Sequence, residues 1–117
     1  MVKLLRKDVL KWIRLLKSGQ YRKGKGQLVS KDGKKFCCLG VWADMQGAVW
    51  EEKFNTLIPF KYKPYPNQLD TLLEDPKLAN GLDYEIQAEL AKINDNSKGF
   101  SKVIKYIEKN VLPFAVK

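Results

Sequence analysis

"QLVSKDGKKFCCLGVWADMQG", residues 27–47, contains the two changes of pattern on which the fold depends. Asp32-Gly33 is typical of a tight turn, because glycine accepts the positive φ that such a turn requires. We therefore expect a short antiparallel strand pair over residues 26–30 and 34–37. From Cys38 onward the apolar residues fall at helical spacing, so a short helix is predicted directly after the second strand.

Further helices are indicated on both sides of this stretch by their apolar periodicity. Asp8 is a candidate cap for a first helix that ends at Ser18-Gly19. Nearer the other end, Asp83 and Ser101 are candidate caps for two amphipathic helices. The sequence thus predicts the α+β class, in a small single domain spanning all 117 residues. A short antiparallel hairpin or small sheet is expected to pack against about four helices.

Length and composition argue against several classes of protein. At this length a core can form without a disulfide or a metal to stabilise it. No apolar run approaches the roughly 18 residues that a membrane-spanning helix needs. The chain has no histidine, which is the usual general base and the commonest transition-metal ligand. We expect a cytoplasmic protein with no metal, no cofactor and no membrane partner.

The two cysteines are candidates for a nucleophile, because Cys38 would begin a helix close to lysines, which favours a thiolate. A cysteine hydrolase also needs a base, however, and histidine is missing. We interpret Cys37 and Cys38 as small buried apolar residues. Paired carboxylates such as Glu51-Glu52 do not show the arrangement of a glycosidase or a metal-dependent nuclease. The prediction is that the protein is not an enzyme, with a cysteine-dependent enzyme as the catalytic alternative.

Positive charge is concentrated in the first third of the chain. Residues 1–35 hold twelve Lys or Arg against Asp8 and Asp32, whereas the remainder holds ten against eleven acids. The whole excess of the net charge of +9 therefore lies at the amino end. Such an asymmetry indicates an anionic partner. A lysine-rich surface that only keeps the protein soluble is the alternative.

The segment "YRKGKG", residues 21–26, is the strongest candidate for binding an anion. It lacks the P-loop pattern, but its glycines would let backbone N–H groups approach a phosphate, its cations add charge, and its tyrosine offers a stacking face. A cationic ridge on the first helix would extend this surface. The candidate ligand-binding residues are Tyr21, Arg22, Lys23, Gly24, Lys25, Gly26, Lys11 and Arg14. A mobile connector whose glycines simply turn the chain is the alternative interpretation.

Aromatic residues divide into an expected core and possible ligand contacts. Trp12, Phe36, Trp42 and Phe100 are expected inside, because the helix faces need partners. Besides the tyrosine at position 21, Tyr62 and Tyr65 are further candidates for stacking against a base.

Three segments together resemble a known group of proteins: "KWIRLLKSGQYRKGKGQL", "FCCLGVWADMQG" and "LAKINDNSKGFSKVIKYIE". Their order is similar to that of a family of small uncharacterised proteins encoded by bacteriophages and prophages. That family has a Cys-Cys-Leu-Gly-Val helix start and a Leu-Asn-Asp sequence before the last helix; here Ile93 replaces the leucine, and residues 48–82 are unmatched. The resemblance implies a viral setting and no specific chemistry.

Charge and resemblance lead to two functional hypotheses. The first is a non-enzymatic phage accessory protein that binds an anionic, phosphate-rich ligand, either a nucleotide signal or nucleic acid, to counter host defence. The second is an inhibitor that binds an acidic host protein through the basic N-terminal third.

Overall fold

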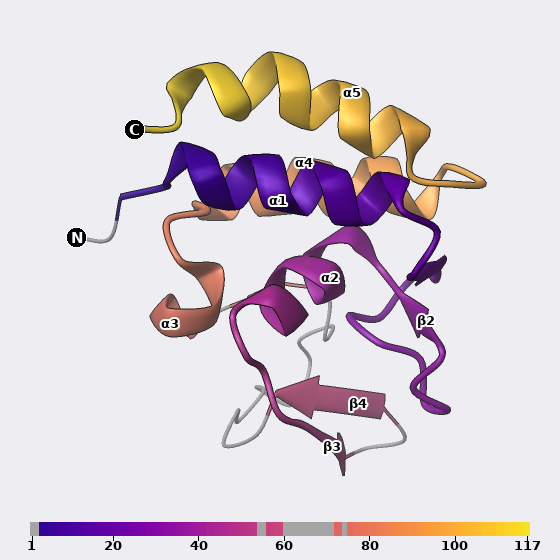
Figure 1. Cartoon of the computed structure of the whole chain (residues 1–117). Coiled ribbons are helices and arrows are strands. Elements are labelled where there is room, and N and C mark those ends of the chain that lie inside the picture. The colour runs from indigo at the N-terminus through magenta and orange to yellow at the C-terminus, as the bar shows by residue number, and fades with distance from the viewer. Residues whose placement is uncertain (1–2, 54–55, 60–71, 74) are drawn as a thin grey trace.

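The computed structural model describes residues 3–53, 56–59, 72–73 and 75–117, with helices gathered at one side and short strands at the other (Figure 1). In chain order the elements are α1 (Arg6–Lys17), β1 (Arg22–Lys23), β2 (Lys35–Phe36), α2 (Cys38–Met45), β3 (Trp50–Lys53), β4 (Thr56–Pro59), α3 (Pro76–Ala79), α4 (Tyr84–Asp95), α5 (Ser101–Asn110) and the 3₁₀ turn η1 (Leu112–Phe114). The α+β class expected from the sequence is confirmed.

The long helices form a layer that covers α2. Figure 1 shows α1 and α5 running side by side in opposite directions, with α4 behind α1 and α2 beneath them. Contacts between α1 and α2, α1 and α5, α2 and α4, and α4 and α5 join the four helices into one core. In the described part of the chain, no helix is both long and apolar enough to cross a membrane.

Helix α2 lies at the centre of this core, and residues 38–43 are all buried. A helix that is apolar on every side is stable only when neighbours surround it. Trp12 of α1 packs against Trp42 of α2, with ring centroids 4.8 Å apart. The indole N–H of Trp12 donates to the Cys38 carbonyl at 3.0 Å, and that of Trp42 donates to the Ala79 carbonyl at 2.8 Å. Both tryptophans are therefore buried with their polar groups satisfied.

The aromatic core predicted from the sequence is confirmed for three of its four members. Trp12, Trp42 and Phe100 are buried, whereas Phe36 is half-buried. Phe36 stays partly exposed because it belongs to the short strand at the edge of the helical layer.

Glycine at position 40 allows α2 to approach the segment that precedes it. A Cβ atom at Gly40 would overlap the carbonyl group of Leu28. That carbonyl accepts a hydrogen bond from the Cys37 amide at 3.0 Å, so it cannot move away without losing its partner. The sequence Cys-Cys-Leu-Gly thus combines a helix start with close packing of backbone against backbone.

The first strand pair differs from the expected hairpin. β2 pairs with β1 in parallel, Arg22 opposite Lys35, and its other edge meets residues 28–30 through an isolated antiparallel bridge between Val29 and Phe36. The expected turn is present, with Gly33 at φ +75°. The predicted pair of residues 26–30 and 34–37 is therefore reduced to one bridge, because the chain bends at residues 26–28, where Gly26 has a φ of +75°.

The middle of the chain supplies a second strand pair. β3 and β4 are antiparallel, with Trp50 opposite Pro59 and Lys53 opposite Thr56. Tyr62 and Tyr65, which the sequence suggested as ligand contacts, lie outside the described residues.

Helix starts follow the predicted caps in one case of three. The Asp83 carboxylate accepts from the Ile86 amide at 2.9 Å, as expected. The predictions for Asp8 and Ser101 are wrong, because α1 starts earlier, at Arg6, and α5 starts at Ser101 itself, without a side-chain cap in either case. The first amide of α1 instead donates to the Val116 carbonyl at 2.7 Å, so the end of the chain replaces the cap.

We predict that Gly40→Ala destabilises the fold strongly, by about 2 kcal/mol or more, since forcing a methyl group into a packed core costs about 1–3 kcal/mol. Chemical denaturation followed by circular dichroism measures this loss. Gly99→Ala is the matched control, because nothing lies within 4 Å of a Cβ atom at Gly99. Equal stability of the two variants would contradict the close packing of α2 on Leu28.

Candidate anion-binding site

A cavity of about 310 Å³ opens beside the β1–β2 pair, and we call it the lysine pocket. Its lining residues come from β1, from residues 24–27 (the glycine loop), from residues 28–30 before the turn (the hairpin arm) and from β2. They are Lys23, Gly24, Lys25, Gln27, Ser30 and Lys35. Among the described residues, the lining holds three lysines and no acid, so this part of the surface is electropositive.

Strand pairing brings these residues together although they are up to twelve positions apart in the chain. The Gly24 amide donates to the Phe36 carbonyl at 2.8 Å, and the Ser30 amide donates to the Lys35 carbonyl at 2.8 Å. β2 therefore lies between the glycine loop and the hairpin arm. A Cβ atom at Gly24 would come within 3.0 Å of the Cβ atom of Lys35, so glycine is what lets the two chains lie this close.

The turn next to the pocket is held by one carboxylate. Asp32 accepts from the Ser30 hydroxyl at 2.5 Å and from the Lys34 amide at 3.0 Å. These two hydrogen bonds lower the pKa of Asp32, the Ser30 bond contributing most. The Ser30 hydroxyl also accepts from the Lys35 amide at 3.0 Å, so its proton is committed to Asp32 and Ser30 supports the pocket more than it binds a ligand.

Asn94, at the end of α4, fixes the glycine loop from the core side. Its side chain is fully buried; Oδ1 accepts from the Cys38 amide at 3.1 Å, and Nδ2 donates to the Gly24 carbonyl at 2.9 Å. The neighbouring Asp95 carboxylate accepts from the Gly26 amide at 3.0 Å. One Asn-Asp pair thus connects α4, the start of α2 and the loop that lines the pocket.

These contacts decide whether the backbone N–H groups of the two glycines, which the sequence suggested for anion binding, can reach a ligand. The Gly24 amide donates to Phe36 and the Gly26 amide to Asp95, so both N–H groups have partners inside the chain. By contrast, the ammonium groups of Lys23, Lys25 and Lys35 make no ion pair or hydrogen bond with the described residues. Positive charge at the pocket therefore comes from side chains rather than from the backbone.

Tyr21 is turned away from the pocket toward an aromatic row. Its ring meets the edge of Phe36 at a centroid distance of 4.9 Å, and Phe36 in turn meets Trp50 at 6.2 Å. Asp44 accepts from the Tyr21 hydroxyl at 2.6 Å and from the Trp50 indole at 3.2 Å. Burial, followed by the hydrogen bond and the charge of Asp44, raises the pKa of Tyr21 to about 12.

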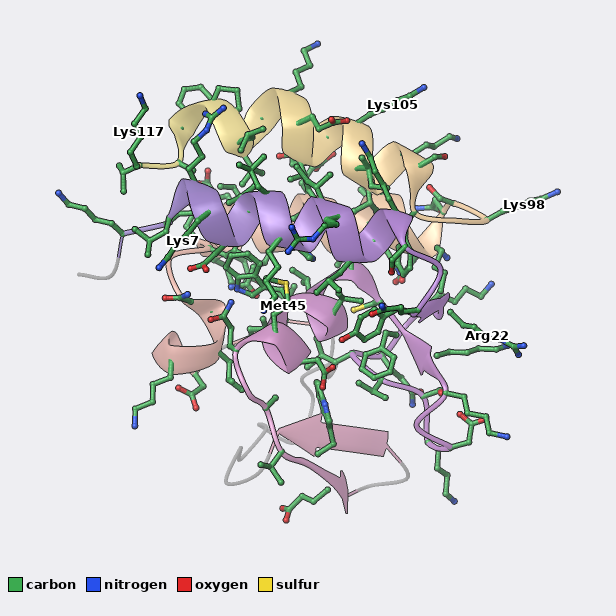
Figure 2. All side chains as sticks on the ribbon, in the orientation of Figure 1. Lys7, Arg22, Met45, Lys98, Lys105 and Lys117 are labelled. Atoms are coloured by element: carbon green, nitrogen blue, oxygen red, sulfur yellow. The ribbon has the colours of Figure 1, made fainter. Side chains whose placement is uncertain are left out.

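The structure gathers only part of the predicted set. Lys23, Gly24 and Lys25 line the pocket, whereas Arg22 is exposed and extends outward from the small sheet (Figure 2). Lys11 and Arg14 are exposed on α1 and do not line this pocket.

Sequence reasoning missed Gln27, Ser30 and Lys35 as pocket residues. The hairpin signal at Asp32-Gly33 could have identified Ser30 and Lys35, because a turn there brings these two residues close together. Gln27 carried no signal of its own, since its position depends on how the glycine loop bends.

The cysteines are core residues at the start of α2. The Cys37 sulfur accepts from the Gly40 amide at 3.4 Å and takes the place of an N-terminal cap. Burial raises the pKa of Cys37 to about 11 and that of Cys38 well above its usual range. Both thiols are therefore protonated near neutral pH, which agrees with the interpretation of these residues as buried apolar groups.

Across the described ranges, no group of three or more Cys, Asp or Glu could hold a metal ion.

A family model described as a domain of unknown function, DUF8296, matches residues 6–111. No curated protein and no solved structure matches the chain significantly. The matched range includes the lysine pocket, the aromatic row and the four helices of the core.

We predict that native protein resists alkylation at both cysteines near pH 8, because burial blocks access and holds both thiols in the protonated form. Iodoacetamide labelling followed by mass spectrometry measures the modification. The same protein in guanidinium should react at both positions. Rapid labelling of native Cys37 would contradict this prediction and would favour a reactive thiol.

We predict that Asn94→Ala lowers the free energy of unfolding by about 2–3 kcal/mol, because the buried Cys38 amide and the half-buried Gly24 carbonyl both lose their partner, and an unsatisfied buried group costs about 1–3 kcal/mol. Urea denaturation measures the change. Asn96→Ala is the matched control, since Asn96 is exposed near the end of the same helix and its side chain donates to the Lys92 carbonyl. A similar effect of both substitutions would show that Asn94 does not have the connecting role.

Proposed function

We propose that this chain, which belongs to the DUF8296 family, binds a small phosphate-bearing ligand of nucleotide size in the lysine pocket. The observation that carries the proposal is the convergence of Lys23, Lys25 and Lys35 on one cavity. Its volume of about 310 Å³ lies at the lower end of the range of roughly 300–1,000 Å³ found for small-molecule sites. A mononucleotide or a comparable phosphate ester is therefore favoured over a larger ligand.

Electrostatics support an anion as the ligand. The three ammonium groups lack partners in the described part of the chain, and each is a strong donor to a phosphate oxygen. Asp32 and Asp95, which contact the segments that line the pocket, accept hydrogen bonds from Ser30 and Gly26. A bound phosphate would thus meet unpaired positive charge while the neighbouring carboxylates keep their structural partners.

Binding without catalysis is the mode of action that the pocket favours. Its side chains supply positive charge and hydrogen bonds, and Gln27 adds an amide that can both donate and accept. The thiols of Cys37 and Cys38 are buried and protonated, so they are poor nucleophiles. Sequestration or sensing of a ligand requires neither a base nor a nucleophile.

The resemblance to small phage-encoded proteins extends the proposal to a biological setting. In that setting the protein acts in the cytoplasm of an infected host cell. Holding a nucleotide signal of the host there would counter a defence response without any chemical step. Support for this part comes from the three quoted segments, and support for the pocket comes from the lysines.

We predict that Lys35→Gln and Lys23→Gln each weaken binding of ADP by about tenfold, since a hydrogen bond to a charged group contributes about 1.5–3 kcal/mol. Isothermal titration at low salt measures the affinity. Lys105→Gln is the matched control, because Lys105 carries the same charge on α5 and points away from the fold (Figure 2). ADP and pyrophosphate should both bind, and adenosine, which lacks phosphate, should not.

Two results would contradict the proposal. Equal loss of affinity in all three lysine variants would show that net charge alone attracts the nucleotide. Absence of binding by ADP, pyrophosphate and cyclic dinucleotides would remove the pocket as a phosphate site. Duplex DNA is distinguished by its salt dependence, because several phosphate contacts give a steep decrease of affinity with salt.

A further inference from the structure

A second cavity, of about 510 Å³, lies where the start of α1 meets the last residues of the chain. It is lined by Leu5, Arg6, Lys7, Leu10 and Lys117, and we call it the Leu10 groove. Its walls are mostly apolar, and the Leu10 side chain is 46% exposed although it belongs to a helix with a well-packed opposite face. None of the described residues lines both this groove and the lysine pocket.

Backbone pairing gives the groove a fixed shape. The Val116 amide donates to the Leu4 carbonyl at 2.9 Å, and the Arg6 amide donates to the Val116 carbonyl at 2.7 Å. Leu5 and Val116 thus form a parallel bridge beside the first turn of α1. Figure 1 shows the start of α1 and the last residues of the chain at the same end of the molecule. The hydrogen bonds therefore hold the wall formed by Leu5 against the wall formed by α1.

Charge at the rim of the groove is positive and unpaired. Arg6, Lys7 and Lys117 make no ion pair with the described residues. Figure 2 shows Lys7 and Lys117 at the end of the molecule where the termini lie. The acid in the same helical turn, Asp8, is half-buried and accepts from the Asn80 side chain at 3.3 Å. An apolar groove with a cationic rim is complementary to an apolar side chain flanked by acids.

We infer that the Leu10 groove docks a short acidic segment of a partner protein, which inserts one apolar side chain against Leu10. A contiguous exposed apolar patch that is rimmed by polar groups is typical of an interaction site. The unpaired cations give specificity for an acidic sequence and accelerate association. The phosphates of a nucleic acid would contact the cations but would leave the apolar walls of the groove exposed to water. A flat lipid surface would not fill a concave site, whereas a protruding side chain does.

The experiment uses the full-length protein, labelled with ¹⁵N, and two acetylated and amidated peptides, Glu-Glu-Phe-Glu-Glu and Glu-Glu-Gly-Glu-Glu. The phenylalanine peptide should shift the amide resonances of Leu5, Lys7 and Leu10. It should bind about tenfold more tightly than the glycine peptide, because burial of a large apolar side chain contributes about 1.5–3 kcal/mol. Leu10→Glu should lose this preference.

Val49→Glu is the matched control, since Val49 is also an exposed apolar residue but lies between α2 and β3. Equal affinity for the two peptides, resonance shifts at Lys23 and Lys35, or no shift at millimolar peptide would overturn the inference. Binding to anionic phosphatidylglycerol vesicles that depends on Leu10, without preference for the phenylalanine peptide, would overturn it in favour of a lipid surface. Titration of the Leu10→Glu variant with ADP measures the lysine pocket separately, since the substitution should leave the affinity for ADP unchanged.

Discussion

The buried amide of Asn94 is the interaction on which the arrangement of this protein depends. A side-chain amide is one of the few groups that can accept and donate at once, and here it satisfies an N–H at the start of α2 and a carbonyl of the glycine loop. Without it, the most buried helix would begin with an unsatisfied amide inside the core, which is costly. Helix packing and loop position are therefore fixed by the same side chain.

This arrangement explains how a flexible sequence can form an ordered pocket. Gly24 and Gly26 give the loop conformational freedom, and that freedom is removed by hydrogen bonds to Phe36, Asn94 and Asp95. The lysines that alternate with these glycines then project from a fixed backbone. In this arrangement Lys23 and Lys35 line the same cavity.

Local signals in the sequence predicted the helices well, and long-range contacts account for most of the differences. The start of α2 directly after a strand, the cap at Asp83 and the burial of Trp12 follow from spacing and residue type. The parallel pairing of β1 with β2 could not be predicted, because two-residue strands have no periodicity of their own. Likewise, no local pattern reveals that Val116 replaces a side-chain cap at α1.

The row of rings from Tyr21 through Phe36 to Trp50 gives the protein a natural optical signal. Phe36 follows Lys35 directly in β2 and its ring contacts Trp50, so one short strand borders both the pocket and the aromatic row. Trp12 and Trp42 are fully enclosed, which leaves the half-buried Trp50 as the indole whose surroundings can change most. A ligand that displaced this strand would therefore be expected to change the fluorescence of Trp50, with emission from the two enclosed indoles as a constant background.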